Sequence, residues 1–136
     1  MSSETLHLEL ITPSSVAAKL EATEVVLPGF LGEMTVLPDH APFVGQLRPG
    51  IVRIRTQQGQ SSFVLGSGFA EISDNQLLVL TRSVQRREDL SADGVRAELA
   101  AAQARLNALS MDDPTYASAK EAVELYEAQL AFLSAA

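Results

Sequence analysis

The sequence predicts an α+β chain in which an N-terminal antiparallel β-sandwich is followed by a C-terminal antiparallel two-helix hairpin. Seven of the eight glycines and five of the six prolines precede residue 69, whereas alanine dominates after residue 90. Apolar residues alternate with polar ones in the first part and recur every three or four positions in the second. We place the boundary after residue 88, which gives a sandwich domain over 1–88 and a hairpin over 89–136.

The first part reads as a series of short strands. Leu6, Leu8 and Leu10 alternate with polar residues, which is typical of a half-buried strand. A second strand over 16–27 is expected to be bent or bulged, and Pro28 and Gly29 end it. Glycine, proline and Asp-Asn turns separate the remaining strands, which we predict over 33–37, 43–47, 51–55, 62–65, 69–72 and 77–84. Short strands at this spacing are typical of a sandwich or a flattened barrel.

The second part reads as two helices. Ser91 is a suitable N-cap for the first helix, which carries an apolar stripe from Val95 to Leu109. Asp112-Asp113-Pro114 predicts a restart, with a carboxylate cap and proline at the first helical position. A second stripe then runs from Tyr116 to Leu133, so the two helices can face each other across the link at 110–113.

The hairpin is not expected to stand alone. About eight large apolar residues in its seam contribute roughly 1.5–3 kcal/mol each when buried. Ordering its ~40 residues costs roughly 1–2 kcal/mol each for the backbone alone. Because these terms leave a thin margin, the hairpin should dock on the sandwich or on a partner, and it is a candidate mobile element.

Composition excludes several classes of protein. The net charge of −7 argues against nucleic-acid binding, and the absence of cysteine excludes disulfides and thiolate metal sites. The N-terminus has no secretory signal pattern, and no run of about 18 apolar residues is present. The negative charge is concentrated in the hairpin, because residues 89–136 carry three basic and eight acidic side chains, or −5.

We find no catalytic or metal-binding constellation. The two histidines are His7, in a strand, and His40, in a loop, and nothing in the sequence places a serine beside His40. Gly66-Ser67-Gly68 lies between strands and is better explained as a bulge or bend than as a phosphate loop. Asp112-Asp113 is better explained as a helix cap than as a metal site. We therefore expect no catalytic residues, no metal and no obligatory cofactor.

The segment from Gly32 to Phe43 is the most informative stretch of the chain. A short strand beginning Gly32-Glu33 leads into a loop bounded by Pro38 and Pro42, which restrict the backbone and present Asp39 and His40. This stretch resembles the signature of the epsilon subunits of rotary F-type ATP synthases, where the loop reads Gly-His-Ala-Pro. Asp39 stands where that family usually has glycine.

The resemblance extends over almost the whole chain. Further matching segments occur in the family's order, at 24–29, 47–53 and 66–72, and a helical hairpin ends the chain. The resemblance implies a non-catalytic central-stalk subunit that binds the gamma subunit and rests on the c-ring, coupling proton flow to ATP synthesis. By resemblance, Glu33, His40, Ala41 and Pro42 form the contact with the c-ring and gamma subunit. It also implies a peripheral position on the cytoplasmic face of the bacterial inner membrane, with membrane association only through the complex.

The hairpin regulates some relatives, either by binding ATP or by contacting the alpha/beta catalytic head and inhibiting hydrolysis. Asp93, Arg96 and Ala97 match the family's nucleotide motif, whereas Ala92 and Gly94 depart from it. An aspartate in the first turn of a helix and an arginine three residues later also form an ordinary ion pair between neighbouring side chains of a helix. In inhibiting relatives the second helix presents basic residues to an acidic segment of a catalytic subunit. Here that helix has only Lys120, against Glu121, Glu124 and Glu127, and like charges repel. We therefore predict weak or absent inhibition.

Two other interpretations stay open at this point. One is a β-sandwich adaptor or ligand-binding module unrelated to the motor, and the other is an enzyme that uses His40. Co-purification with a gamma-type subunit separates the first from the motor interpretation. Alanine at His40 separates the second, because an enzyme loses nearly all activity whereas an interface is only loosened.

Overall fold

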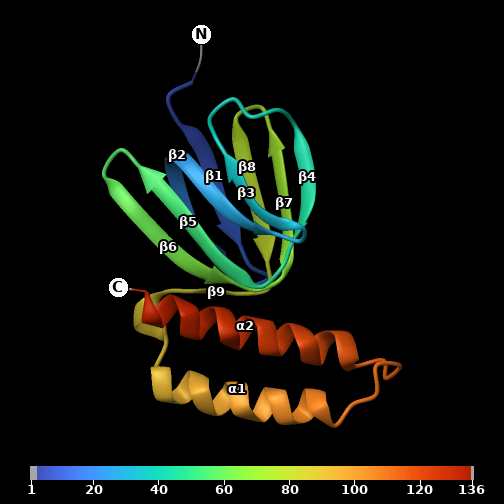
Figure 1. Cartoon of the computed structure of the whole chain (residues 1–136). Coiled ribbons are helices and arrows are strands. Elements are labelled where there is room, and N and C mark those ends of the chain that lie inside the picture. Colours follow the sequence, from blue (N-terminus) through green and yellow to red (C-terminus); the bar gives the residue numbers. More distant parts are fainter. Residues whose placement is uncertain (1–2, 136) are drawn as a thin grey trace.

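The computed structural model describes residues 3–135, and Figure 1 shows its strands gathered at one end and its two long helices stacked beneath them. Within these residues the strands are β1 (Leu6–Ile11), β2 (Val16–Gly29), β3 (Gly32–Val36), β4 (Phe43–Leu47), β5 (Gly50–Thr56), β6 (Gly59–Leu65), β7 (Gly68–Ser73), β8 (Gln76–Thr81) and β9 (Val84–Gln85). A 3-10 turn at Arg87–Asp89 precedes α1 (Ala92–Asn107) and α2 (Tyr116–Ser134). The predicted order of strands followed by two helices is confirmed.

The strands form a strongly curved sheet that folds over itself. Their order is β1-β8-β7-β4-β2-β5-β6-β9, β3 pairs with β2, and the additional pairing of β1 with β2 brings the sheet back on itself. The pairings are antiparallel except for β1 with β8, which is parallel. The predicted antiparallel sandwich is therefore correct apart from this pair, which joins strands far apart in the sequence and has no local signal.

The core lies between the two layers of strands. Leu6, Leu8 and Leu10 have no exposed surface, as the alternation in the sequence predicts. In β2 the pairing with β5 shifts register between Ala22 and Glu24, which confirms the expected bulge. Buried residues of other strands complete this core, among them Val36, Val52, Ile54, Leu65, Ile72, Leu77 and Val79.

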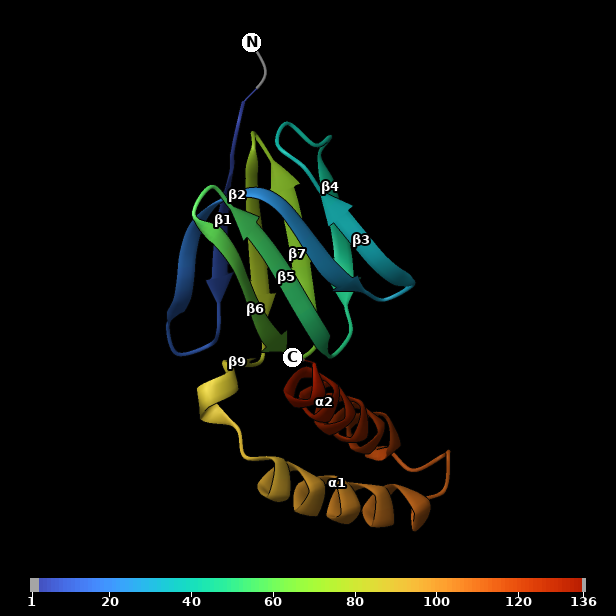
Figure 2. The same cartoon turned by 60° about the vertical axis from the view of Figure 1, so that its left-hand side comes forward.

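The predicted strand over 77–84 is too long. It ends at Thr81, because the backbone N–H of Arg82 donates to the carbonyl of Ser67 at 3.1 Å, outside the β7–β8 ladder. The chain then crosses to the other layer, where β9 pairs with β6 at Val64 and Leu65. This crossing brings the polypeptide to the end of the sandwich from which the helices depart (Figure 2).

Helix α1 starts as predicted, because the Ser91 hydroxyl accepts the Gly94 backbone N–H at 3.3 Å. The predicted start of the second helix at Pro114 is wrong by two residues. Asp113 instead caps a single tight turn: its carboxylate accepts the N–H of Thr115 at 2.8 Å, and its carbonyl accepts the N–H of Tyr116 at 3.0 Å. Helix α2 begins only after this turn.

The hairpin is docked on the sandwich. Helix α2 lies between the strands and α1 in both cartoon views (Figures 1 and 2). Its buried residues are Ala119, Val123, Gln129 and Phe132, whereas α1 buries only Val95. The expectation that the hairpin needs a docking surface is consistent with this arrangement, since α2 is covered on two sides and α1 packs mainly on α2.

Candidate docking surfaces

The proline-bounded loop is held in a tight turn. The His40 backbone N–H donates to the carbonyl of Leu37 at 3.1 Å, and its Nδ1 lies 2.8 Å from the carbonyl oxygen of Ala41. Asp39 has a φ of 65°, in the left-handed region that glycine adopts freely and aspartate tolerates better than most residues. The backbone thus explains why either aspartate or glycine suits this position.

Asp39 also ties the loop to two other segments. Its carboxylate accepts the backbone N–H of Ser3 at 2.6 Å, and its own N–H donates to Oδ1 of Asn75 at 2.8 Å. The Asn75 amide in turn donates to the carbonyl of Thr5 at 2.7 Å. The loop, the β7–β8 turn and the N-terminal segment therefore form one hydrogen-bonded cluster, and Ala41 and Pro42 are exposed beside it.

Glu33 lies at the other end of β3 from this loop. It is opposite Pro28 in the β2–β3 pairing and forms an ion pair with Arg53 of β5. Glu24 and Arg55 form a second pair nearby, at 3.8 Å. The structure does not bring Glu33 and His40 together, because they lie at opposite ends of the exposed edge formed by β3 and the loop that follows it. Glu33 lies on the outer face of the sandwich that carries the ion pairs.

The predicted nucleotide residues form only a local pair. Arg96 donates to the Asp93 carboxylate at 2.9 Å, within the first turns of α1, and both side chains are exposed. Their mutual hydrogen bond matches the ordinary helix pair that was the alternative interpretation. Neither residue lines the groove described below.

The sequence reasoning missed an apolar surface on the outside of β4, β7 and β8, together with Phe30 of the adjacent β2–β3 turn. Its largest members are exposed to an unusual degree: Val44 69%, Phe30 57%, Phe69 52% and Leu80 47%. Phe69 and Leu80 are directly opposite each other in the β7–β8 pairing, and Ile11 is opposite Leu80 in the β1–β8 pairing. The available signal was the run Leu77-Leu78-Val79-Leu80, which is apolar on both faces of its strand.

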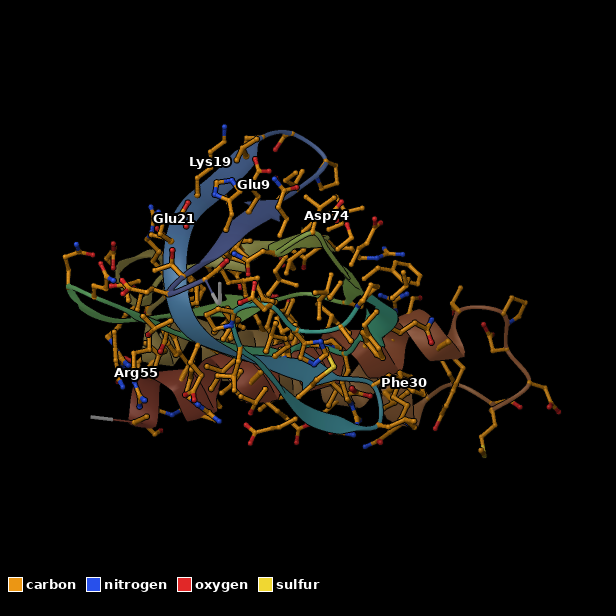
Figure 3. The ribbon with its side chains drawn as sticks, turned by 90° about the horizontal axis from the view of Figure 1, so that it is seen from above. Glu9, Lys19, Glu21, Phe30, Arg55 and Asp74 are labelled. Carbon is orange, nitrogen blue, oxygen red and sulfur yellow. The ribbon has the colours of Figure 1, made fainter. Side chains whose placement is uncertain are left out.

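This apolar surface ends in a groove of about 670 Å³ between the sandwich and α2. Phe30, Phe69 and Leu80 belong to the sandwich side, and Lys120 and Glu124 belong to the helix side. Figure 3 shows Phe30 at the tip of the β2–β3 hairpin, well away from the polar cluster of Glu9, Lys19 and Glu21. Contiguous exposed apolar side chains on a folded protein are typical of an interaction site.

Ser67 and Gly68 of the Gly66-Ser67-Gly68 segment line the groove. A Cβ atom at Gly68 would lie 1.9 Å from the Leu80 carbonyl oxygen, so the close crossing of the two strands requires glycine there. Ser67, between the glycines, donates its hydroxyl to Glu121 of α2 at 3.1 Å. The segment is a bend between β6 and β7, in agreement with the interpretation from the sequence.

Two carboxyl groups outside these surfaces are perturbed. The hydrogen bond from His7 lowers the pKa of Glu21. Burial opposes this shift, and a hydrogen bond from Thr5 lowers the pKa further by a smaller amount. Hydrogen bonds from the Thr115 side chain and backbone lower the pKa of Asp113, with a smaller contribution from Arg105. The hydrogen bonds that lower these two pKa values stabilise a local strand pairing and a local turn, and they do not form a reactive site.

Comparison with known proteins agrees with this architecture. Residues 5–87 match the family model for the ATP synthase, Delta/Epsilon chain, beta-sandwich domain. The chain is 31% identical to the ATP synthase epsilon chain of Jannaschia sp. over 121 residues, covering 89% of this chain and 91% of that one. It is 32% identical to the ATP synthase epsilon chain of Fuscovulum blasticum, covering 94% and 98%.

Solved structures show the same fold. A chain of the Euglena gracilis mitochondrial ATP synthase, in a structure of OSCP, F1 and c-ring, superposes with a TM-score of 0.83 at 24% identity. That match covers 98% of this chain and 84% of the other. A chain from the central stalk and c-ring of the Tetrahymena thermophila enzyme gives 0.65 at 15% identity, covering 96% and 99%.

The matched relatives identify the chain as a non-catalytic subunit of a larger assembly, built as a sandwich with a docked helical hairpin. The chain belongs to the ATP synthase delta/epsilon family, and its curated relatives are ATP synthase epsilon chains. No helix within residues 3–135 has the length and apolar character needed to cross a membrane.

Proposed function

We propose that this chain is a central-stalk subunit of a proton-translocating F-type ATP synthase, where it couples rotation of the c-ring to ATP synthesis in the catalytic head. One observation supports this most: an apolar surface around Phe69 and Leu80 is left open on a sandwich whose core is otherwise complete. A subunit that transmits torque needs such a surface for stable attachment to a neighbour. Family membership identifies the assembly.

The proposal assigns two contact regions. The apolar surface binds the gamma-type subunit, since Val44, Phe69 and Leu80 expose apolar side chains there. The exposed edge bearing Glu33, His40, Ala41 and Pro42 contacts the c-ring. The hydrogen bonds that fix Asp39 make this loop stiff, which suits a contact under load. On this assignment the chain is peripheral, on the cytoplasmic face of the bacterial inner membrane.

We further propose that residues 1–88 form the docking domain and that the hairpin over 89–136 inhibits hydrolysis weakly or not at all. Glu124 accepts a hydrogen bond from Arg48 at 3.2 Å, and Glu121 accepts one from Ser67. These acidic residues are thus engaged in holding α2 against the sandwich. They also repel an acidic segment of a catalytic subunit, so extension of the helix into the head is disfavoured. Nucleotide binding by Asp93 and Arg96 forms no part of the proposal.

Co-purification tests the attachment. A tagged chain should recover the gamma-type subunit of the same organism in a stable complex. Replacing Phe69 and Leu80 together by serine should reduce recovery at least tenfold, because the central apolar pair of the surface is lost. Arg55→Ser, on the ion-paired face, is the matched control and should leave recovery unchanged. Equal recovery with both variants, or no gamma-type subunit with the wild type, would refute the proposal.

A further inference from the structure

The end of the sandwich that lies away from the helices brings together three separate segments of the chain. They are residues 3–5, the turn between β7 and β8, and the loop over 37–42 (Figures 1 and 2). The strand order β1-β8-β7-β4 puts the β7–β8 turn between the start of β1 and the start of β4. A side chain in this turn can therefore reach both the N-terminal segment and the loop that carries Ala41 and Pro42.

Asn75 connects these segments. Its side-chain Oδ1 accepts the backbone N–H of Asp39 at 2.8 Å, and its Nδ2 donates to the carbonyl of Thr5 at 2.7 Å. Its own backbone carbonyl accepts the N–H of His7 at 3.1 Å. A carboxamide carries a donor and an acceptor side by side, so this one side chain bridges the loop and the N-terminal segment.

The β7–β8 turn does not itself need an asparagine side chain. Asp74 and Asn75 have φ values of 50° and 58°, and Ser73 pairs with Gln76, as in a two-residue hairpin turn of type I′. Glycine is the residue that such a turn favours at its second position. Both side-chain hydrogen bonds of Asn75 go to other segments. The side chain therefore acts on the neighbouring loop and not on its own turn.

We propose that Asn75 is a positioning residue for the c-ring contact, because it holds Asp39, and with it the exposed Ala41 and Pro42, in the conformation that the ring binds. This inference rests on the proposed function. A loop that is ordered before binding loses less conformational freedom when the contact forms. If only a fraction of the chains has the loop in the binding conformation, the apparent Kd rises by the inverse of that fraction. Loss of the Asn75 amide should thus weaken ring binding.

Amide exchange tests the effect on the loop. Asn75→Gly isolates the side chain, because glycine suits the left-handed backbone and removes the two bridging hydrogen bonds. Asp74→Gly is the matched control, since it places glycine at the neighbouring left-handed position and keeps the Asn75 amide. The His40 N–H keeps its own acceptor, the carbonyl of Leu37, in both variants. Its exchange should quicken at least severalfold in Asn75→Gly and stay near the wild-type rate in Asp74→Gly.

Binding of the chain, in complex with the gamma-type subunit, to purified c-rings tests the effect on the contact. Asn75→Gly should weaken ring binding about fivefold or more, whereas Asp74→Gly should stay within about twofold of the wild type. Recovery of the gamma-type subunit and the thermal unfolding temperature should be the same for both variants. A merely structural role for Asn75 would instead lower these two quantities along with ring binding, and that result would overturn the inference.

The remaining outcomes separate this inference from the proposed function. Equal ring affinity for Asn75→Gly and Asp74→Gly, or unchanged His40 exchange in Asn75→Gly, would overturn the inference while leaving the proposed function intact. If the wild-type complex binds rings no more tightly than the gamma-type subunit alone, the proposed ring contact is wrong and the inference is wrong with it.

Discussion

At the scale of single residues, Asp39 shows how a departure from a family pattern is accommodated. The position has a φ of 65°, so a residue without special tolerance for left-handed backbone is strained there. Aspartate tolerates that conformation and adds a hydrogen bond with Ser3, whereas glycine would only relieve the strain. The Asp39 carboxylate is thus part of the hydrogen-bonded scaffold of the loop.

Asp39→Ala should destabilise the chain by about 1–2 kcal/mol, because alanine combines the cost of a left-handed backbone with loss of the carboxylate. Asp39→Asn should stay within about 0.5 kcal/mol, since asparagine tolerates the same backbone and keeps a side-chain acceptor. Urea denaturation of both variants measures the difference. Equal stabilities would show that backbone strain at Asp39 is negligible.

Glu21 gives a prediction for pH. Its pKa is lowered in the folded chain, mainly by the His7 hydrogen bond, so its contribution is fully present above the unfolded carboxyl pKa of about 4.3. That contribution disappears as the pH falls through the lower folded value. Because Glu21 is exposed, Glu21→Gln should cost less than about 1 kcal/mol at pH 6 and nothing at pH 2. Denaturation curves at the two pH values test this, and a cost that grows toward low pH would contradict it.

At the scale of elements, α2 is the connection between the two parts of the chain. The contacts that hold it to the sandwich and its exit segment include Arg48 to Glu124, Ser67 to Glu121 and Gln85 to Gln129. The guanidinium of Arg87 also lies over the ring of Phe132, at 4.6 Å. Most of these are polar and partly exposed, whereas Phe132 is only 4% exposed. The aromatic anchor should therefore contribute most to docking.

Phe132→Ala should weaken docking by about 3 kcal/mol, through lost burial and the loss of the contact with Arg87. The effect should appear as faster amide exchange in α2 with little change in β1 and β8. Phe69→Ala, which removes an aromatic ring that is already half exposed, is the control and should leave α2 unchanged. If both variants exchange alike, the anchor does not lie at Phe132.

The sequence predicts those elements whose signals are local. Alternation places Leu6, Leu8 and Leu10 in the core, and Ser91 marks the start of α1. What it does not predict depends on long-range geometry. The parallel β1–β8 pair and the crossing to β9 join distant segments, and the exposure of Phe69 follows only once β7 and β8 are placed. The sequence alone does not show whether an apolar residue in a strand lies in the core or on an outer docking face.

At the scale of the whole molecule, the sandwich has two unlike outer faces and a helical layer at one end. One face carries the Glu33–Arg53 and Glu24–Arg55 pairs, and the other carries Phe69 and Leu80. With the contact regions proposed above, this asymmetry favours a single orientation of the subunit toward its neighbours. The acidic hairpin, charged −5 over residues 89–136, is packed against the end of the sandwich rather than presented as a free arm.

Truncation after residue 88 should raise ATP hydrolysis by the reconstituted complex less than about twofold. The cause is the acidic, engaged surface of α2, which suits it poorly for contact with an acidic segment of a catalytic subunit. The matched control is the complex rebuilt with the full chain at the same subunit ratio. A severalfold rise in hydrolysis would show that the hairpin inhibits.

ATP synthesis by inside-out membrane vesicles tests most directly whether this chain couples proton flow to ATP synthesis. Vesicles whose ATP synthase lacks this subunit should make little ATP under an imposed proton gradient. Adding the purified wild-type chain should restore synthesis, whereas the variant with serine at both Phe69 and Leu80 should restore about a tenth or less. Restoration by that variant, or no restoration by the wild type, would contradict the account.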